Sequence, residues 1–182
     1  FSAVARSYDD KAIADSFVIE KSRQNSRTER TNLENSLDRL VAEPGVTIEQ
    51  INRINAMLAS SHRFAHAIMA LEAGLPLTPP VPARQEVRIF MEDAEKTLSL
   101  LEQVLTGVKV AGKKFPNLRE DHNRIIASGD PENQRYALVN IEADRMTNSL
   151  NTLREEILEW ARMRRGAGAA EPVAASTPVA KT

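Results

Sequence analysis

Cysteine is absent from this chain of 182 residues, and aromatic side chains make up only 4% of it. The absence of cysteine excludes a disulfide scaffold, a cysteine-ligated zinc site and a thiol nucleophile, and it leaves the redox compartment undetermined. The 24 basic and 25 acidic residues give a net charge of -1. A nucleic-acid-binding domain is expected to be strongly basic, so we predict no nucleic-acid partner.

Long apolar runs are also missing. The longest purely apolar stretch, residues 67–71, is far shorter than the roughly 20 residues of a membrane-spanning helix. The sequence starts at Phe1, with no initiating Met and no signal peptide. These features predict a soluble, helix-rich piece cut from a longer protein.

Glycine and proline are few, and they cluster at 44–45, 74–82 and 129–131. Between these breaks the apolar residues follow helical spacing, and no stretch alternates as a half-buried strand would. The pattern predicts an all-α, antiparallel helical bundle with four long helices, the first of them extended, plus a short one. The predicted helices span about 2–43, 47–74, 83–110, 117–127 and 131–165.

Several helix ends carry recognisable signals. Thr47 and Gln50 form a capping-box pattern at the start of the second helix, and Gly74 is a natural C-terminal cap. The proline-rich connector 75–82 should run extended. Asp130 followed by Pro131 marks the start of the last helix.

The run from Glu20 to Asn32 contains no apolar residue and no helix breaker. It predicts one continuous first helix of about 40 residues, reaching roughly 60 Å. A helix that is polar on every face either spans solvent or connects two parts of a protein. We therefore divide the chain into a helical stalk (1–32), a bundle domain (33–165) and a flexible tail (166–182).

The last helix has the most regular apolar pattern. Its apolar residues alternate spacings of three and four, which predicts a seam that packs against other helices. The seam consists of Val139, Ala143, Met146, Leu150, Leu153, Ile157 and Trp160.

His62 and His66 lie four residues apart, a spacing that can place two imidazoles on one metal ion. A zinc protease motif needs Glu after the first histidine, where this chain has Arg63. No histidine follows a glutamate by three positions, as a di-iron bundle requires. A half-buried, hydrogen-bonded pair is favoured over a metal site, for which these histidines are only weak candidates.

Catalytic motifs are absent from the sequence. The glycines form no phosphate-binding loop, and no Gly-x-Ser-x-Gly elbow occurs. The carboxylate runs, such as Glu155 and Glu156, continue round outer helix faces where solvated charge is the default. We predict that the chain is not an enzyme and uses no cofactor.

Trp160 is followed by Arg162, Arg164 and Arg165 near the end of the last helix. Basic residues at a helix C-terminus are favourable in themselves, and this is the favoured interpretation. An indole beside arginines is also suited to anionic lipid headgroups, which is the functional alternative.

Two segments, 32–44 (NLENSLDRLVAEP) and 62–72 (HRFAHAIMALE), resemble the cytoplasmic helical region of fusaric-acid-resistance-type (FUSC-like) bacterial inner-membrane proteins. That family is related to aromatic-acid efflux proteins, and the resemblance covers about 23–75. No catalytic role is implied for the matching residues, although Arg39 and Glu43 can pair and Pro44 ends the helix. The matching residues are Asn32, Arg39, Glu43, Pro44, Arg63 and His66.

The resemblance implies a domain on the cytoplasmic side of a bacterial inner membrane, attached to a membrane-spanning part that precedes Phe1. We expect it to associate with copies of itself, or with another part of the same protein, through the long first helix and the seam of the last. Two alternatives stay open: a stand-alone helical adaptor, and a bundle that senses a small molecule or a metal.

Overall fold

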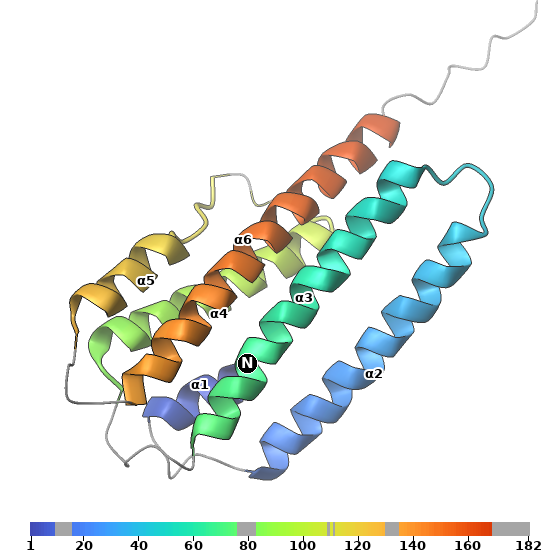
Figure 1. Cartoon of the computed structure of the whole chain (residues 1–182). Helices are drawn as coiled ribbons and strands as arrows, with labels where there is room; N and C mark the ends of the chain where they lie inside the picture. The colour runs from blue at the N-terminus through green and yellow to red at the C-terminus, as the bar shows by residue number, and fades with distance from the viewer. Residues whose placement is uncertain (10–15, 76–82, 109, 111, 130–134, 169–182) are drawn as a thin grey trace, which may run out of the picture.

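The chain folds as a bundle of α-helices. The computed structural model describes residues 1–9, 16–75, 83–108, 110, 112–129 and 135–168 (Figure 1). These residues contain six helices and no strand, so the all-α prediction is confirmed. The helices are α1 (Ser2–Asp9), α2 (Ser16–Val41), α3 (Ile48–Gly74), α4 (Gln85–Leu105), α5 (Leu118–Ala127) and α6 (Arg135–Gly168).

The antiparallel pair α3 and α6 forms the centre of the molecule and its most extensive helix–helix interface (Figure 1). Helix α4 packs on α6, and α5 packs on both of them. Helix α1 lies at one end, against α3 and α4, while α2 runs back along the outside of α3 (Figure 1). At the opposite end, α2, α3 and α6 extend beyond α4 and α5 (Figure 1).

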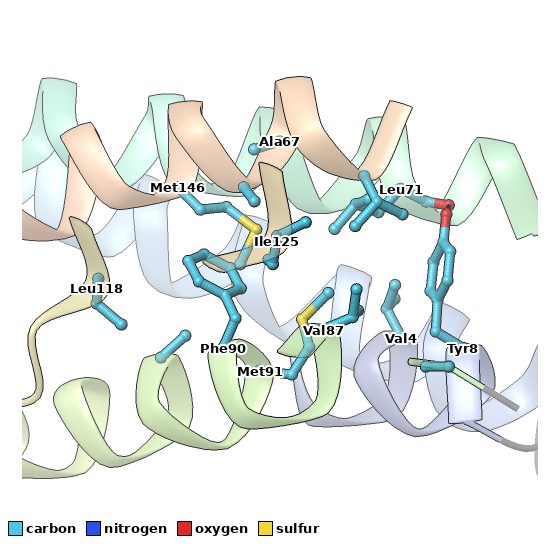
Figure 2. Packing of buried hydrophobic residues seen from close by; sticks show 14 of the residues in the cluster. Val4, Tyr8, Ala67, Leu71, Val87, Phe90, Met91, Leu118, Ile125 and Met146 are labelled. Carbon is cyan, nitrogen blue, oxygen red and sulfur yellow. Dashed lines mark hydrogen bonds between the residues drawn. The ribbon is translucent and has the colours of Figure 1, made fainter. Parts of the chain in front are cut away.

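The hydrophobic core lies where α1, α3, α4, α5 and α6 meet (Figure 2). Phe90 of α4 and Met146 of α6 are fully buried and point toward each other in it (Figure 2). The predicted seam of α6 supplies much of this core, and its packing against other helices is confirmed. Its buried members are Val139, Ala143, Met146, Leu150 and Ile157.

The predicted continuous first helix is wrong. Helices α1 and α2 are separate elements with different directions (Figure 1). Val4 and Tyr8 of α1 are buried in the core, and the Tyr8 hydroxyl donates a hydrogen bond of 2.8 Å to the Leu71 carbonyl. Burying these two side chains requires α1 to lie across the bundle. Residues 10–15, which connect the two helices, lie outside the described residues.

The predicted cap of α3 is confirmed at its N-terminus and wrong at its C-terminus. The Thr47 hydroxyl accepts a hydrogen bond from the backbone N–H of Gln50, and the side-chain oxygen of Gln50 accepts one from the backbone N–H of Thr47. Gly74 instead lies inside the last turn and is buried. A Cβ atom at this position would overlap the Leu138 side chain, so glycine permits the close approach of α6.

Other helix ends differ modestly from the prediction. Helix α4 stops at Leu105, about one turn early, and Gly107 follows it with φ of +80°. Helix α6 continues to Gly168, past the predicted end at 165. Most of the extended connector (76–82), the Asp130–Pro131 start signal and the tail from 169 lie outside the described residues.

In the described parts of the chain, none of the helices combines the length and the apolar character that crossing a membrane requires.

Candidate functional site

An ion pair and a histidine–carboxylate contact join α2 to α3. Arg23 of α2 contacts Glu72 of α3, and it also lies 3.1 Å from Glu20. Closer to the start of α3, His62 Nε2 is 3.6 Å from Glu34 of α2. In the polar run 20–32 every residue except Arg23 is exposed, and the contact of Arg23 with Glu72 joins the run to α3.

A cavity of about 280 Å³ lies between α1, α2 and α3. Its α2 wall is one helical face, since the residues there recur at spacings of three and four. Small side chains, Ser22, Ser26 and Ala65, leave the space that larger ones would fill. The described residues that line it are Phe1, Ala3, Val4, Ile19, Ser22, Arg23, Ser26, Arg27, Arg30, Ala65, His66, Ile68, Met69 and Glu72.

The two walls of this cavity differ in polarity. Helices α1 and α3 contribute Val4, Ile68 and Met69, whereas α2 contributes three arginines. Arg23 is paired with Glu72 and Glu20, and Arg30 lies 4.0 Å from Glu34. Arg27 is exposed and has no ion-pair partner among the described residues. The cavity is thus mostly apolar on the side of α1 and α3, apart from His66 and Glu72, and positively charged on the side of α2.

The two histidines with metal-compatible spacing have different surroundings. His62 is half-buried and faces Glu34, whereas His66 is exposed and lines the cavity. The expected half-buried, hydrogen-bonded pair is therefore wrong: only His62 is half-buried, and its Nε2 atom makes no hydrogen bond in the described structure. Across the parts of the chain with a described structure, no three or more His, Asp and Glu side chains are grouped to hold a metal ion.

The residues that carried the family resemblance do not form one site. Asn32, Arg39, Glu43 and Pro44 are exposed, and in the described structure no ion pair joins Arg39 to Glu43. Helix α2 ends at Val41, shortly before Pro44, and Gly45 makes the turn with φ of +90°.

Two further residues of this set lie on α3. Arg63 donates a hydrogen bond of 2.9 Å to the Ser60 hydroxyl, and only His66 reaches the cavity.

Apolar side chains gather where α2 and α3 extend beyond the core. All the buried residues of α3 lie from Ser60 onward, and its first twelve residues include none. In the part before them, Ile48 is 77% exposed, and Val41 at the end of α2 is 56% exposed. We call these two residues, together with the partly exposed Leu33, Leu37 and Leu40, the tip surface.

Two of the three arginines in the basic cluster of α6 make polar contacts within that helix. Arg162 lies 2.7 Å from Glu159, and Arg165 Nε donates to the Ala161 carbonyl at 3.0 Å. Arg164 is exposed, and Trp160 is half-buried. The hydrogen bond of Arg165 to a carbonyl near the helix end agrees with the favoured interpretation of this cluster.

A buried carboxyl group between α4 and α5 was not predicted from the sequence. Asp121 is 4% exposed, and burial, reinforced by the nearby Asp93, raises its pKa, although Arg124 opposes the shift. The surface carboxyl of Asp144 behaves oppositely, because its hydrogen bond with Arg119 lowers its pKa. Nothing in the local sequence distinguished Asp121 from a solvated residue, since its burial depends on α4.

We expect Asp121→Asn to raise the free energy of unfolding at pH 7. A raised native pKa means that the folded state binds the proton more tightly than the unfolded state. Stability is therefore lost as the pH rises from the unfolded pKa, about 3.9, through the higher native pKa. Asparagine does not titrate, so the variant should have a higher free energy of unfolding than the parent at pH 7. Urea unfolding experiments should show this difference disappear near pH 3.

Asp144→Asn serves as the control with the opposite sign. Its lowered native pKa stabilises the fold above the unfolded pKa, so the variant should be less stable than the parent at pH 7. This difference should shrink as the pH falls through the native pKa. A loss of stability at pH 7 in both variants would contradict the assignment for Asp121.

Comparison of the chain with protein-family models, with curated proteins and with solved structures found no match. The resemblance of 32–44 and 62–72 to FUSC-like proteins therefore stays a prediction. The tip surface and the cavity, in contrast, are features of the fold itself, and each offers groups that a partner could contact.

Proposed function

We propose that this chain is a helical self-association domain with no chemistry of its own. In this proposal it forms the cytoplasmic part of a bacterial inner-membrane, transporter-like protein of the aromatic-acid efflux type. The observation that carries self-association is the tip surface, where apolar side chains of α2 and α3 stay exposed. The segments 32–44 and 62–72 support the transporter context by their resemblance alone.

The position of the tip surface favours a second copy as its partner. The seam of α6 is largely buried within one chain, so its apolar side chains are not available for association. The tip surface lies outside the core and stays exposed. A net charge of -1 gives little repulsion between copies, and most oligomers pair identical surfaces about a twofold axis.

Ile48→Asp should weaken self-association by about tenfold or more, because a charge would replace an apolar side chain in the contact. Sedimentation velocity over a concentration series measures this change. Ile126→Asp is the matched control, since Ile126 of α5 is 53% exposed but lies outside the tip surface. A monomeric parent chain, or equal weakening by both variants, would contradict the proposal.

The transporter context has a separate test. The reading frame upstream of Phe1 should encode several apolar runs of about 20 residues each. A frame without such runs would favour the stand-alone adaptor and leave self-association intact. We include in the transporter proposal a contact of Trp160, Arg162, Arg164 and Arg165 with anionic lipid, supported by the exposure of Arg164.

A further inference from the structure

The cavity between α1, α2 and α3 has a mostly apolar side, which also carries His66 and Glu72, and an α2 side that carries its three arginines. Val4 of α1 and Ile68 and Met69 of α3 form its apolar side. Its α2 side carries Arg23 and Arg27 on one helical face, with Ser22 and Ser26 on the same face. A ligand in this space would therefore touch apolar carbon on one side and guanidinium groups on the other.

Two of the three arginines that line the cavity have carboxylate partners, because Arg23 pairs with Glu72 and Glu20 and Arg30 lies 4.0 Å from Glu34. Arg23, Arg27 and Arg30 line the cavity, and Glu72 is the one carboxylate among its described lining residues. Glu72 is already paired with Arg23. Arg27, one turn further along α2, has no ion-pair partner in the described structure. An acidic group on a ligand would give Arg27 an ion-pair partner, and guanidinium is the side chain best suited to bind such a group.

The size of the cavity limits the ligand. A volume of about 280 Å³ is slightly smaller than the roughly 300 Å³ at which the range for small-molecule sites begins, so only a small ligand would fit. Such sites are mostly apolar and use a few placed polar groups for orientation. The cavity has both features: an apolar side from two helices and a row of donors from a third.

We propose that this cavity binds a small amphipathic organic anion, with one acidic group and an apolar body. The acidic group contacts Arg27 and Arg23, and the apolar body lies on Ile68, Met69 and Val4. This site goes beyond the proposed self-association, because none of its residues belongs to the tip surface. It also gives the interface between α2 and α3 a role besides holding the two helices together.

Isothermal titration of the 182-residue chain with octanoate tests the proposal. Octanoate should bind with one site per chain, and added NaCl should weaken its binding. Acetate lacks the apolar body and octyltrimethylammonium lacks the negative charge, so each should bind at least about tenfold more weakly. Equal binding of octanoate and octyltrimethylammonium, or no binding of octanoate, would overturn the proposal.

Two variants locate the binding in this cavity. Arg27→Gln removes an unpaired charge, and Ser26→Phe fills the space; each should weaken octanoate binding about tenfold or more. Both residues are exposed on α2, so the fold should survive, as far-UV circular dichroism can verify. Arg39→Gln, on the same helix but outside the cavity, is the matched control and should bind like the parent.

The outcomes separate this proposal from the proposed function. If the cavity variants bind octanoate as tightly as the parent, the site is wrong, whatever the oligomeric state. If Ile48→Asp is monomeric and still binds octanoate, the site is independent of self-association. If Ser26→Phe leaves binding unchanged but disrupts association, the cavity is part of a contact between copies and the ligand proposal fails.

Discussion

Replacing Leu150 by alanine should lower the free energy of unfolding by about 2–5 kcal/mol. Leu150 lies in the middle of α6 and is 0% exposed. It belongs to the core cluster that α3, α4, α5 and α6 build together. Removing its branched end takes away apolar contacts and leaves a cavity that the surrounding helices fill only partly. Urea unfolding followed by far-UV circular dichroism measures the change.

Leu105→Ala is the matched control for this substitution. Leu105 ends α4 and is 47% exposed, so its loss should change stability by no more than about 0.5 kcal/mol. Similar losses at the two positions would mean that the α6 seam is not the centre of the core.

The second large effect is expected at Tyr8, which is 3% exposed in α1. Tyr8→Ala should lower the free energy of unfolding by about 3–5 kcal/mol, as is typical of a buried aromatic side chain. It removes a ring that packs beside Leu71 and the hydrogen bond from its hydroxyl to the Leu71 carbonyl (Figure 2). Chemical denaturation gives this value directly.

Tyr8→Phe separates the ring from the hydroxyl. It keeps the apolar contacts and loses one hydrogen bond, so it should cost only about 0.5–1.5 kcal/mol. The pair of variants also tests the division of the chain. If residues 1–32 form a stalk that is independent of the bundle, Tyr8→Ala should leave the stability of the bundle unchanged.

The candidate sites show where local patterns lose their predictive value. The spacing of His62 and His66 is evident in the sequence, yet the two side chains have different neighbours because α2 lies beside α3. Arg23 belongs to a run with the pattern of a solvated helix, and Glu72 lies 49 positions away in the chain. Only the fold of α2 onto α3 creates their ion pair and the cavity beside it.

Gly74 and Asp121 illustrate the same limit inside the bundle. The sequence identifies Gly74 as a helix end, whereas its role is to admit Leu138 of α6 at close range. Asp121 has the local pattern of an ordinary surface carboxylate on a short helix. Its burial, and the pKa that follows from it, come from the position of α5 against α4.

By itself, the sequence determined that the described structure is all-helical, where α3 begins, and most of the apolar residues that α6 contributes to the core. These are local properties, set by a 3.6-residue period, a capping box and a few Gly and Pro residues. The tertiary structure alone decided that α1 joins the core, that α2 returns along α3, and that three arginines of α2 line a cavity with apolar residues of α1 and α3. Those arrangements depend on burial shared between segments far apart in the chain, which no local window of sequence contains.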